Sequence, residues 1–326
     1  MTDASSVGFV AIGRNEGGRF KACLEALLSV GERVVYVDSG SHDDSVEFAQ
    51  GKGANVVELT TDIPFTAARA RNAGFDALIA KWPDTERVMF IDGDCILCDG
   101  FVASANRHLE KNQDTAIVTG RCRERFPEAT IYNRLCEIEW NGPIGEISAC
   151  GGIFLVRTKN FKSVGGFNPT IIAAEDDDFC VRVREDGSRI LRIDADMCLH
   201  DADIHHFRQW WQRMVRAGHA FAQLGEIHPG YFKAQRRRAW GWGFFLPVLS
   251  LLLVPMTWGL SLLLLFLYPL SLFRTRSGLI AAGIAAQHAT LAALFMTLSK
   301  FPNLKGIIDY RVKKLKRRNI GIVEYK

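Results

Sequence analysis

Two aspartates separated by one glycine follow a short apolar run in the first third of the chain. The run, residues 88–91, has the length and composition of a strand buried on both faces. Side chains alternate along an extended backbone, so Asp92 and Asp94 point the same way, and Gly93 permits a close approach from outside. Paired carboxylates suit a hard divalent cation that also binds water and substrate phosphates. A solvated acidic loop is the alternative interpretation of this pattern.

Polar side chains also follow two earlier predicted strands, at residues 7–12 and 34–37. Asn15 and Glu16 come after the first strand, and Asp38 ends the second. Strands that alternate with helical segments predict a mostly parallel sheet. Such sheets bind ligands at the carboxyl ends of their strands, so these side chains and the aspartate pair are expected to line one crevice. There Asp38 binds a ribose or a base edge, or else forms a turn.

Three further groups of polar residues have types and positions that suit catalysis. Arg69 and Arg71 lie on an alanine-rich predicted helix and either approach a phosphate or form a solvated face. Residues 175–178 are all acidic and open another helix, where the helix dipole favours acids as caps. Crowding raises the pKa of at least one of them, which suits a general base. His200 ends a later strand and is either structural or part of the site.

The composition narrows the class of protein. The 326 residues are 48% apolar and 23% charged, enough for one large domain or two unequal ones. Basic clusters at 236–238 and 313–318 adjoin apolar segments, which indicates an anionic membrane surface rather than nucleic acid. The eight scattered cysteines are typical of reduced cytosolic thiols. Cys95 and Cys98 form a C-x-x-C without a second pair, so no metal or redox role is expected there.

The carboxyl-terminal third predicts contact with a bilayer. Residues 240–273 are apolar but interrupted by prolines, which favours one tilted, kinked helix or a re-entrant pair, and residues 278–298 form a second apolar segment. Residues 207–216 place aromatic side chains beside cations, as in an interfacial helix. The positive-inside rule then puts both basic clusters in the cytosol. A buried core hairpin is the alternative. The first residues lack the regions of a signal peptide, so the first domain is expected in the cytosol.

Five sequence blocks occur in an order that resembles the family 2 glycosyltransferases, whose fold is the nucleotide-sugar-binding GT-A fold. The resemblance covers roughly residues 7–225 and implies an α/β, Rossmann-like mixed sheet, followed here by carboxyl-terminal membrane helices. The blocks are residues 9–16, 34–45, 68–74, 92–94, and the set 151–152, 165–167 and 175–176.

The resemblance implies a role for each matching residue. Asp38 contacts the uracil or ribose, and Asp92 faces the ribose or the waters of a metal ion. Asp94 binds Mn²⁺ or Mg²⁺ that bridges the diphosphate, and His200 completes the metal or phosphate site. Asp176 is the catalytic base. Contacts with the nucleotide sugar are expected from Asn15, Glu16, Asp38, Arg69, Arg71 and Asp92.

The expected activity is inverting, metal-dependent transfer of one sugar per encounter. Processive members of the family carry Gln-x-x-Arg-Trp, and residues 209–214 depart from that spacing. The donor is expected to be a UDP-sugar. The acceptor is a lipid-linked sugar or polysaccharide, as in exopolysaccharide or envelope assembly, at the cytosolic face of the inner membrane. The expected parts are a catalytic domain at 1–225, a basic linker at 226–242, membrane segments at 243–299 and a basic tail at 300–326.

Two rival functions remain open at this point. A sugar nucleotidyltransferase shares the sheet but needs a glycine-rich phosphate loop after its first strand, and residues 13–16 are not such a loop. A catalytically silent, membrane-anchored sensor or scaffold does not need the three intact aspartates, Asp92, Asp94 and Asp176.

Overall fold

The computed structural model describes residues 6–60 and 62–316, and the chain divides into two compact units. Unit 1 comprises Met1–Phe126 and Glu139–Ala202, and unit 2 comprises Pro127–Ile138 and Asp203–Lys326. All the predicted site residues therefore lie in unit 1. The helix that follows residue 203, which the sequence analysis assigned to the catalytic domain, lies in unit 2.

Unit 1 is built on a mixed sheet, which the described residues form from nine strands in the order β3-β2-β1-β4-β8-β6-β9-β5, with β7 paired to β9. β1 to β4 run parallel to one another, whereas β8 is antiparallel to both β4 and β6. The strands are β1 Val7–Gly13, β2 Val34–Asp38, β3 Asn55–Glu58, β4 Arg87–Asp92, β5 Cys95–Leu97, β6 Thr115–Glu124, β7 Gly145–Glu146, β8 Phe154–Arg157 and β9 Arg189–His200.

The register of the parallel strands confirms the predicted shared edge. Ile12 of β1 pairs with Asp92 of β4, and Gly13 pairs with Asp38 of β2. The polar ends of three strands therefore meet at one edge of the sheet, as the alternation of strands and helices predicts.

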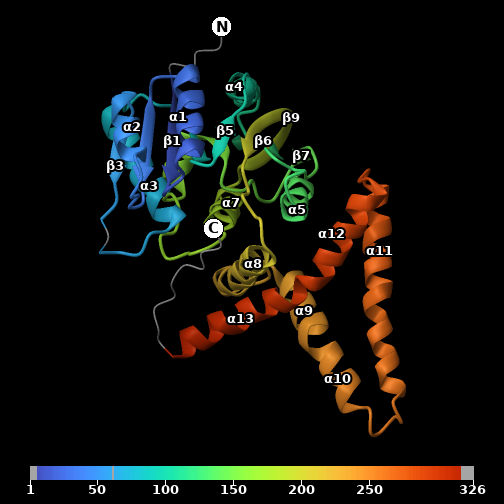
Figure 1. Ribbon diagram of the computed structural model, residues 1–326. Coiled ribbons are helices and arrows are strands. Elements are labelled where there is room, and N and C mark those ends of the chain that lie inside the picture. Colours follow the sequence, from blue (N-terminus) through green and yellow to red (C-terminus); the bar gives the residue numbers. More distant parts are fainter. Residues whose placement is uncertain (1–5, 61, 317–326) are drawn as a thin grey trace. The chain divides into compact units, whose positions relative to one another are not determined.

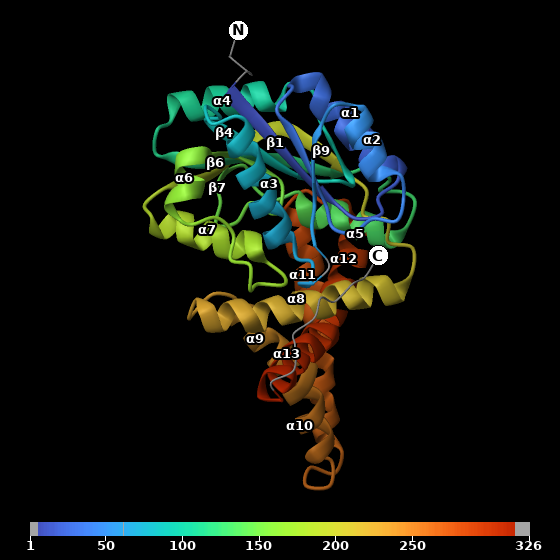
Figure 2. The same ribbon diagram turned by 90° about the vertical axis from the view of Figure 1, so that its left-hand side faces the viewer.

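Helices cover both faces of this sheet (Figures 1 and 2). Alternate residues of β1 divide between the faces, with Phe9 in one buried cluster and Val10 in the other. Gly74 brings α3 close to β1, because a Cβ there would lie 2.3 Å from Val10 Cγ1. One face carries α1 Gly18–Val30, α2 Ser45–Gly51 and α4 Phe101–Lys111; the other carries α3 Ala67–Lys81, α6 Thr158–Ser163 and α7 Glu175–Glu185.

β9 ends at His200, as the sequence analysis indicated. The structure has one continuous strand, Arg189–His200. Acidic residues that interrupt the apolar pattern face partners on β6: Arg121 Nη2 lies 2.5 Å from Asp194 Oδ1. Cross-strand charge pairs let the strand continue through polar residues.

Unit 2 is helical over its described residues after 206. Two of its helices pack tightly, because glycines let their backbones approach: a Cβ on Gly218 of α8 would lie 2.0 Å from Asn303 O of α13. The elements are α8 Phe207–Ile227, α9 Lys233–Trp240, η2 Gly241–Phe245, α10 Leu246–Leu252, η3 Leu260–Phe266, α11 Leu267–Ala281, α12 Ala286–Leu298 and α13 Lys300–Leu315. The helix α5, Ile131–Trp140, begins in unit 2 and ends in unit 1.

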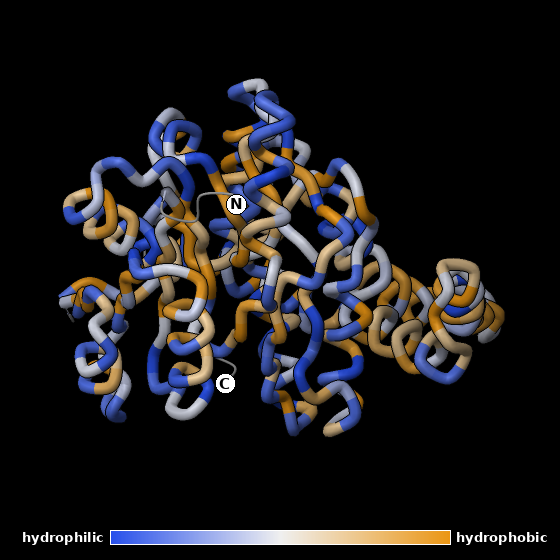
Figure 3. The backbone as a smooth tube through the Cα atoms, turned by 90° about the horizontal axis from the view of Figure 1, so that it is seen from above, coloured by the Kyte–Doolittle hydropathy of each residue, from blue (hydrophilic) through white to orange (hydrophobic). Residues whose placement is uncertain are grey.

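The apolar segment at 240–273 forms a helical hairpin rather than one continuous helix, and its entry into a membrane stays a prediction. The chain turns between α10 and η3, and Ser261 Oγ donates to Ser250 O at 2.7 Å. Most of this hairpin is coloured as hydrophobic in Figure 3. Among the described residues, Leu260–Ala281 is the one helix long and apolar enough to cross a membrane, and most of its large apolar side chains are exposed.

Two expectations about unit 2 are corrected. The second segment, 278–298, is interrupted by a turn at 282–285, which leaves α12 with 13 residues, about 20 Å and too short for a bilayer core. The predicted interfacial helix is the start of α8, and its aromatic face is partly occupied: the Trp210 ring packs 4.8 Å from that of Phe295 and is 4% exposed.

Candidate functional site

Asp38 shapes the loop after β2. Its Oδ1 accepts a hydrogen bond from Tyr36 Oη at 2.9 Å, and its Oδ2 accepts from the backbone N–H groups of Gly40 and Ser41 at 2.8 Å each. Burial, together with the adjacent carboxylate, raises the pKa of Tyr36. The structure therefore gives Asp38 the turn-forming role, and its contact with a nucleotide stays a prediction.

Asn15 joins the loops that follow β1 and β2. It has a left-handed backbone, with φ of 55°. Its N–H donates to Ser41 Oγ at 2.9 Å, and its Oδ1 accepts from the N–H of His42 at 2.7 Å. The neighbouring Glu16 pairs with Arg19 at 2.9 Å. These two predicted site residues thus lie at the common edge and brace it, and their contact with a donor is untested.

The two arginines of α3 have separate partners. Arg69 donates to the carbonyl oxygens of Ile63 at 2.7 Å and Thr60 at 3.0 Å, so it closes the loop before its own helix. Arg71 points into the site instead: its Nη2 donates to Asp92 Oδ1 at 2.7 Å and its Nη1 to Glu175 Oε1 at 2.5 Å. The two arginines, which were expected to approach a phosphate together, therefore contact different groups.

The guanidinium of Arg71 is buried, with the residue 2% exposed. Burial favours its neutral form, but the charges of Asp92 and Glu175 outweigh that effect and raise the pKa of Arg71. Gly152 leaves room for the head group, since a Cβ there would lie 2.4 Å from Arg71 Nη2. Arg71 thus ties the end of β4, the glycine pair before β8 and the start of α7 into one rigid centre.

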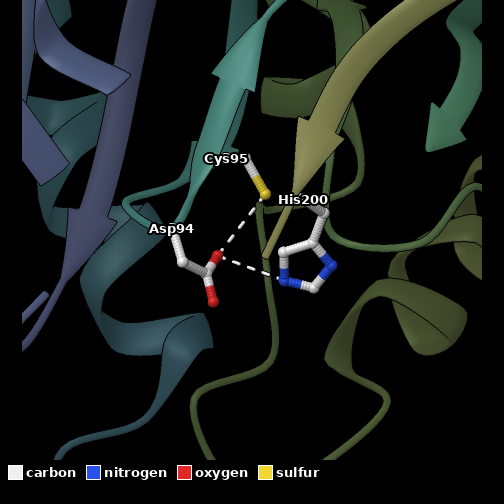
Figure 4. Close-up of side chains that lie close together, drawn as sticks. All are labelled: Asp94, Cys95 and His200. Atoms are coloured by element: carbon white, nitrogen blue, oxygen red, sulfur yellow. Dashed lines mark hydrogen bonds and ion pairs between the residues drawn. The ribbon is translucent and has the colours of Figure 1, made fainter. Parts of the chain in front are cut away.

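The other aspartate has different partners. Asp94 Oδ1 lies 3.2 Å from His200 Nε2, and the thiol of Cys95 donates to the same oxygen at 3.4 Å (Figure 4). The three ligand atoms lie within 4.8 Å of one another, and this is the group among the described residues that could hold a metal. Asp92, predicted as a second metal residue, is outside the group and pairs with Arg71.

Strand pairing brings His200 to this place. Cys95 is opposite His200 in the antiparallel pair of β5 and β9, and the Trp140 ring covers the imidazole at 4.3 Å. Although burial disfavours the imidazolium, the adjoining Cys95 and Asp94 side chains raise the pKa of His200 well above its usual range. The sequence analysis missed Cys95; its position directly after Asp94 was the available signal.

The four acidic residues at the start of α7 differ in their burial and in their partners. Glu175 is buried against Arg71, and Asp178 is buried with Arg182 Nη2 at 2.6 Å. Asp176 is only half-buried. Burial and the neighbouring Asp177 raise the pKa of Asp176 well above its usual range. A half-exposed carboxylate with a raised pKa can accept a proton from a bound hydroxyl.

Comparison with known proteins identifies the class of this arrangement. Residues 10–164 match the model of glycosyl transferase family 2, and residues 134–208 match that of the N-terminal domain of galactosyltransferase. Over residues 10–164 the chain is thus similar to glycosyl transferase family 2. It is a glycosyltransferase, as the resemblance implied, and the two matches together span the aspartate pair, the acidic start of α7 and His200.

Solved structures confirm the fold. The mannosyltransferase PcManGT of Pyrobaculum calidifontis, in complex with GDP-Man and Mn²⁺, is similar over 96% of this chain and 88% of its own, with 18% identity and a TM-score of 0.57. TarS of S. aureus covers 72% of this chain and 47% of its own, at 15% identity and a TM-score of 0.45, which is too low to support an argument. The first likeness and the mixed sheet support the expected GT-A fold class.

Proposed function

We propose that this glycosyltransferase moves a sugar from a nucleotide-diphosphate sugar to an acceptor hydroxyl and inverts the anomeric centre. The observation that carries the proposal is the Arg71 bridge, because it links the loop of the aspartate pair to the helix that bears Asp176. A donor-binding carboxylate pair and a base on the same rigid centre are what a direct displacement needs.

A divalent cation fits the donor side of this site. The Asp94 carboxylate and the His200 imidazole are acceptable ligands for Mn²⁺, and PcManGT was solved with GDP-Man and Mn²⁺. When bound, Mn²⁺ or Mg²⁺ supplies positive charge that offsets the negative charge developing on the departing diphosphate. We propose Asp92 as the contact to the ribose or to the waters of the ion. Asp38, Asn15, Glu16 and Arg69 stay predicted donor contacts, Asp38 through its loop.

Asp176 is proposed as the general base. Its carboxylate takes the proton of the acceptor hydroxyl as that oxygen forms a bond to the anomeric carbon. The bond from that carbon to the diphosphate oxygen breaks, and its electron pair leaves with the diphosphate. Attack from the face opposite the leaving group inverts the configuration. Because its pKa is raised, the Asp176 carboxylate is a stronger base than an ordinary aspartate.

We further propose that the acceptor is a lipid-linked sugar or glycan and that the hairpin of unit 2 enters the cytosolic leaflet of the inner membrane, with the catalytic unit in the cytosol. Supporting this, large apolar side chains of the hairpin are bare: Leu252 is 67% and Trp258 is 96% exposed. Anchoring raises the effective concentration of the enzyme near such an acceptor.

The transfer proposal is tested with the full chain in detergent, incubated with Mn²⁺ and a panel of UDP- and GDP-sugars. We expect one donor to be consumed, and NMR of the product to show an inverted anomer. Asp94→Ala should weaken donor binding, whereas Asp176→Asn should keep donor binding and lose transfer. If every donor stays intact and Asp94→Ala changes neither metal nor nucleotide binding, the proposal fails. Full transfer by Asp176→Asn would remove that residue as the base.

A further inference from the structure

Sulfur atoms surround the buried side of the Asp94–His200 pair. Cys95, Cys122 and Cys198 come from the adjacent strands β5, β6 and β9, and Cys122 pairs in register with Cys198. Cys122 and Cys198 are therefore neighbours across β6 and β9, and Cys95 is opposite His200 across β5 and β9. The proposed metal site therefore has soft donors on its inner side, which the roles assigned so far do not use.

The distances within the group match the coordination shell of a small cation. Around a tetrahedral Zn²⁺, bonds of about 2.0 Å to oxygen or nitrogen and about 2.3 Å to sulfur give edges of roughly 3.3 Å and 3.5 Å. The corresponding separations here are 3.2 Å from Asp94 Oδ1 to His200 Nε2 and 3.4 Å from Asp94 Oδ1 to Cys95 Sγ. Two of the three separations thus match a tetrahedral shell, and the third, from His200 Nε2 to Cys95 Sγ, is within 4.8 Å.

The donor types determine which ion is preferred. Thiolate and imidazole ligands favour Zn²⁺ or Co²⁺, whereas Mg²⁺ and Mn²⁺ prefer oxygen. Three protein ligands with one open position are typical of catalytic zinc sites, and structural sites are closed by a fourth protein ligand. Asp94 and His200 keep side-chain exposures of 8% and 17%, so an incoming oxygen can complete the shell, and fully buried Cys95 forms its base.

We propose that Asp94, Cys95 and His200 together bind a thiophilic divalent cation, Zn²⁺ or Co²⁺, more tightly than Mn²⁺ or Mg²⁺. This inference rests on the proposed metal site at Asp94. It adds Cys95 as a ligand, and it changes the metal preference that the carboxylate pair alone predicts. The C-x-x-C spacing is irrelevant to it, because Cys98 is not a member of the group.

The test is a Co²⁺ titration of the full-length protein in detergent, followed by the ultraviolet charge-transfer band that a cobalt–thiolate bond produces. Wild type and Cys98→Ser should show the band. Cys95→Ser should lose it and bind Co²⁺ at least about tenfold more weakly, the lower end of what removing even an outer-shell partner costs. Mn²⁺ binding, measured by electron paramagnetic resonance, should change far less in Cys95→Ser.

X-ray absorption at the zinc edge of the wild type gives the same answer without a variant, should Cys95→Ser fail to fold. A sulfur scatterer near 2.3 Å, about the usual zinc–sulfur distance, supports the inference. Co²⁺ or Zn²⁺ bound without sulfur overturns it and leaves the transfer proposal intact. Equal affinity of the wild type for Mn²⁺ and Zn²⁺ overturns the preference. Absence of binding by every one of these ions removes both this inference and the proposed metal site.

Discussion

A single buried arginine organises the site at the scale of residues. Buried charges persist in proteins when they are paired, and removing one partner leaves the other without compensation. Arg71 is the partner of two carboxylates, Asp92 and Glu175, so its loss would leave both carboxylates without this cationic partner. Its role is to position groups that act on the donor and acceptor, as well as to stabilise unit 1.

Arg71→Met should therefore lower the free energy of unfolding by about 3–5 kcal/mol, the usual cost of breaking a buried ion pair. Arg33→Met is a matched control, because Arg33 pairs at 2.7 Å with Asp84, whose side chain is 69% exposed. The control should lose much less stability, because solvent-exposed ion pairs contribute little. Denaturant unfolding of both variants measures the difference, and equal losses would contradict the central role of Arg71.

The pKa of Asp176 leads to a prediction about pH. Burial first, and then the charge of Asp177, raise this pKa, so the acid limb of kcat/KM should lie above the ordinary aspartate range. A base must be deprotonated, so activity falls as pH drops through this pKa. Asp177→Asn removes one like charge and should move the limb to lower pH. Asp186→Asn, at the other end of α7, should leave it in place. A limb unmoved by Asp177→Asn would contradict this assignment.

At the scale of elements, glycines decide where backbones meet. Gly306 of α13 faces α8 so closely that a Cβ would lie 2.0 Å from Val215 O and 2.8 Å from His219 N. These are backbone atoms, which cannot rotate away as side chains do. Small residues therefore determine how closely α8 packs against α13. The facing surfaces of the two helices are buried against each other within unit 2.

Gly306→Ala should separate α8 from α13 and cost about 1–3 kcal/mol, as overpacking does. Gly278→Ala is the matched control, because nothing lies within 4 Å of a Cβ there and alanine favours a helix by about 1 kcal/mol. Hydrogen exchange should become faster in both packed helices for the first variant only. Unchanged protection would show that the crossing tolerates a methyl group.

At the scale of the whole molecule, the exposed hairpin of unit 2 is the feature that a folded domain in water does not explain. Contiguous bare apolar surface of this kind indicates a membrane or a partner. The helix Leu260–Ala281 is long and apolar enough to cross a membrane, and most of its large apolar side chains are exposed. The proposed anchoring follows from that surface together with the basic residues of α9.

The double variant Leu252→Arg, Leu263→Arg should shift the protein from the vesicle pellet to the supernatant in a co-sedimentation assay with anionic lipid vesicles. Each charge costs about 2.5–3.5 kcal/mol in a bilayer core. Ile63→Arg and Phe126→Arg, at exposed apolar positions of unit 1, serve as the control and should leave partition unchanged. Wild type that stays in the supernatant would contradict membrane anchoring.

Much of unit 1 follows from local sequence. Apolar runs such as residues 88–91 determine the strands, because burial on both faces requires it, and the polar residues after them must lie at the edge where parallel strands end. The pattern therefore gave the α/β class, the position of Asp92 and the acidic start of α7. The prolines within residues 240–273 left one kinked helix or a re-entrant pair open, and only the structure shows a hairpin there.

Only the tertiary structure decided which side chains meet. Arg71 and Glu175 are 104 residues apart, and no local pattern distinguishes Arg71 from Arg69, two positions earlier on the same helix. Likewise Cys95 meets His200 through the pairing of β5 with β9. Sequence periodicity fixes the face on which a side chain lies, whereas its partner depends on strand register and helix docking between distant segments. That is why the carboxylates were predictable and the thiol beside them was not.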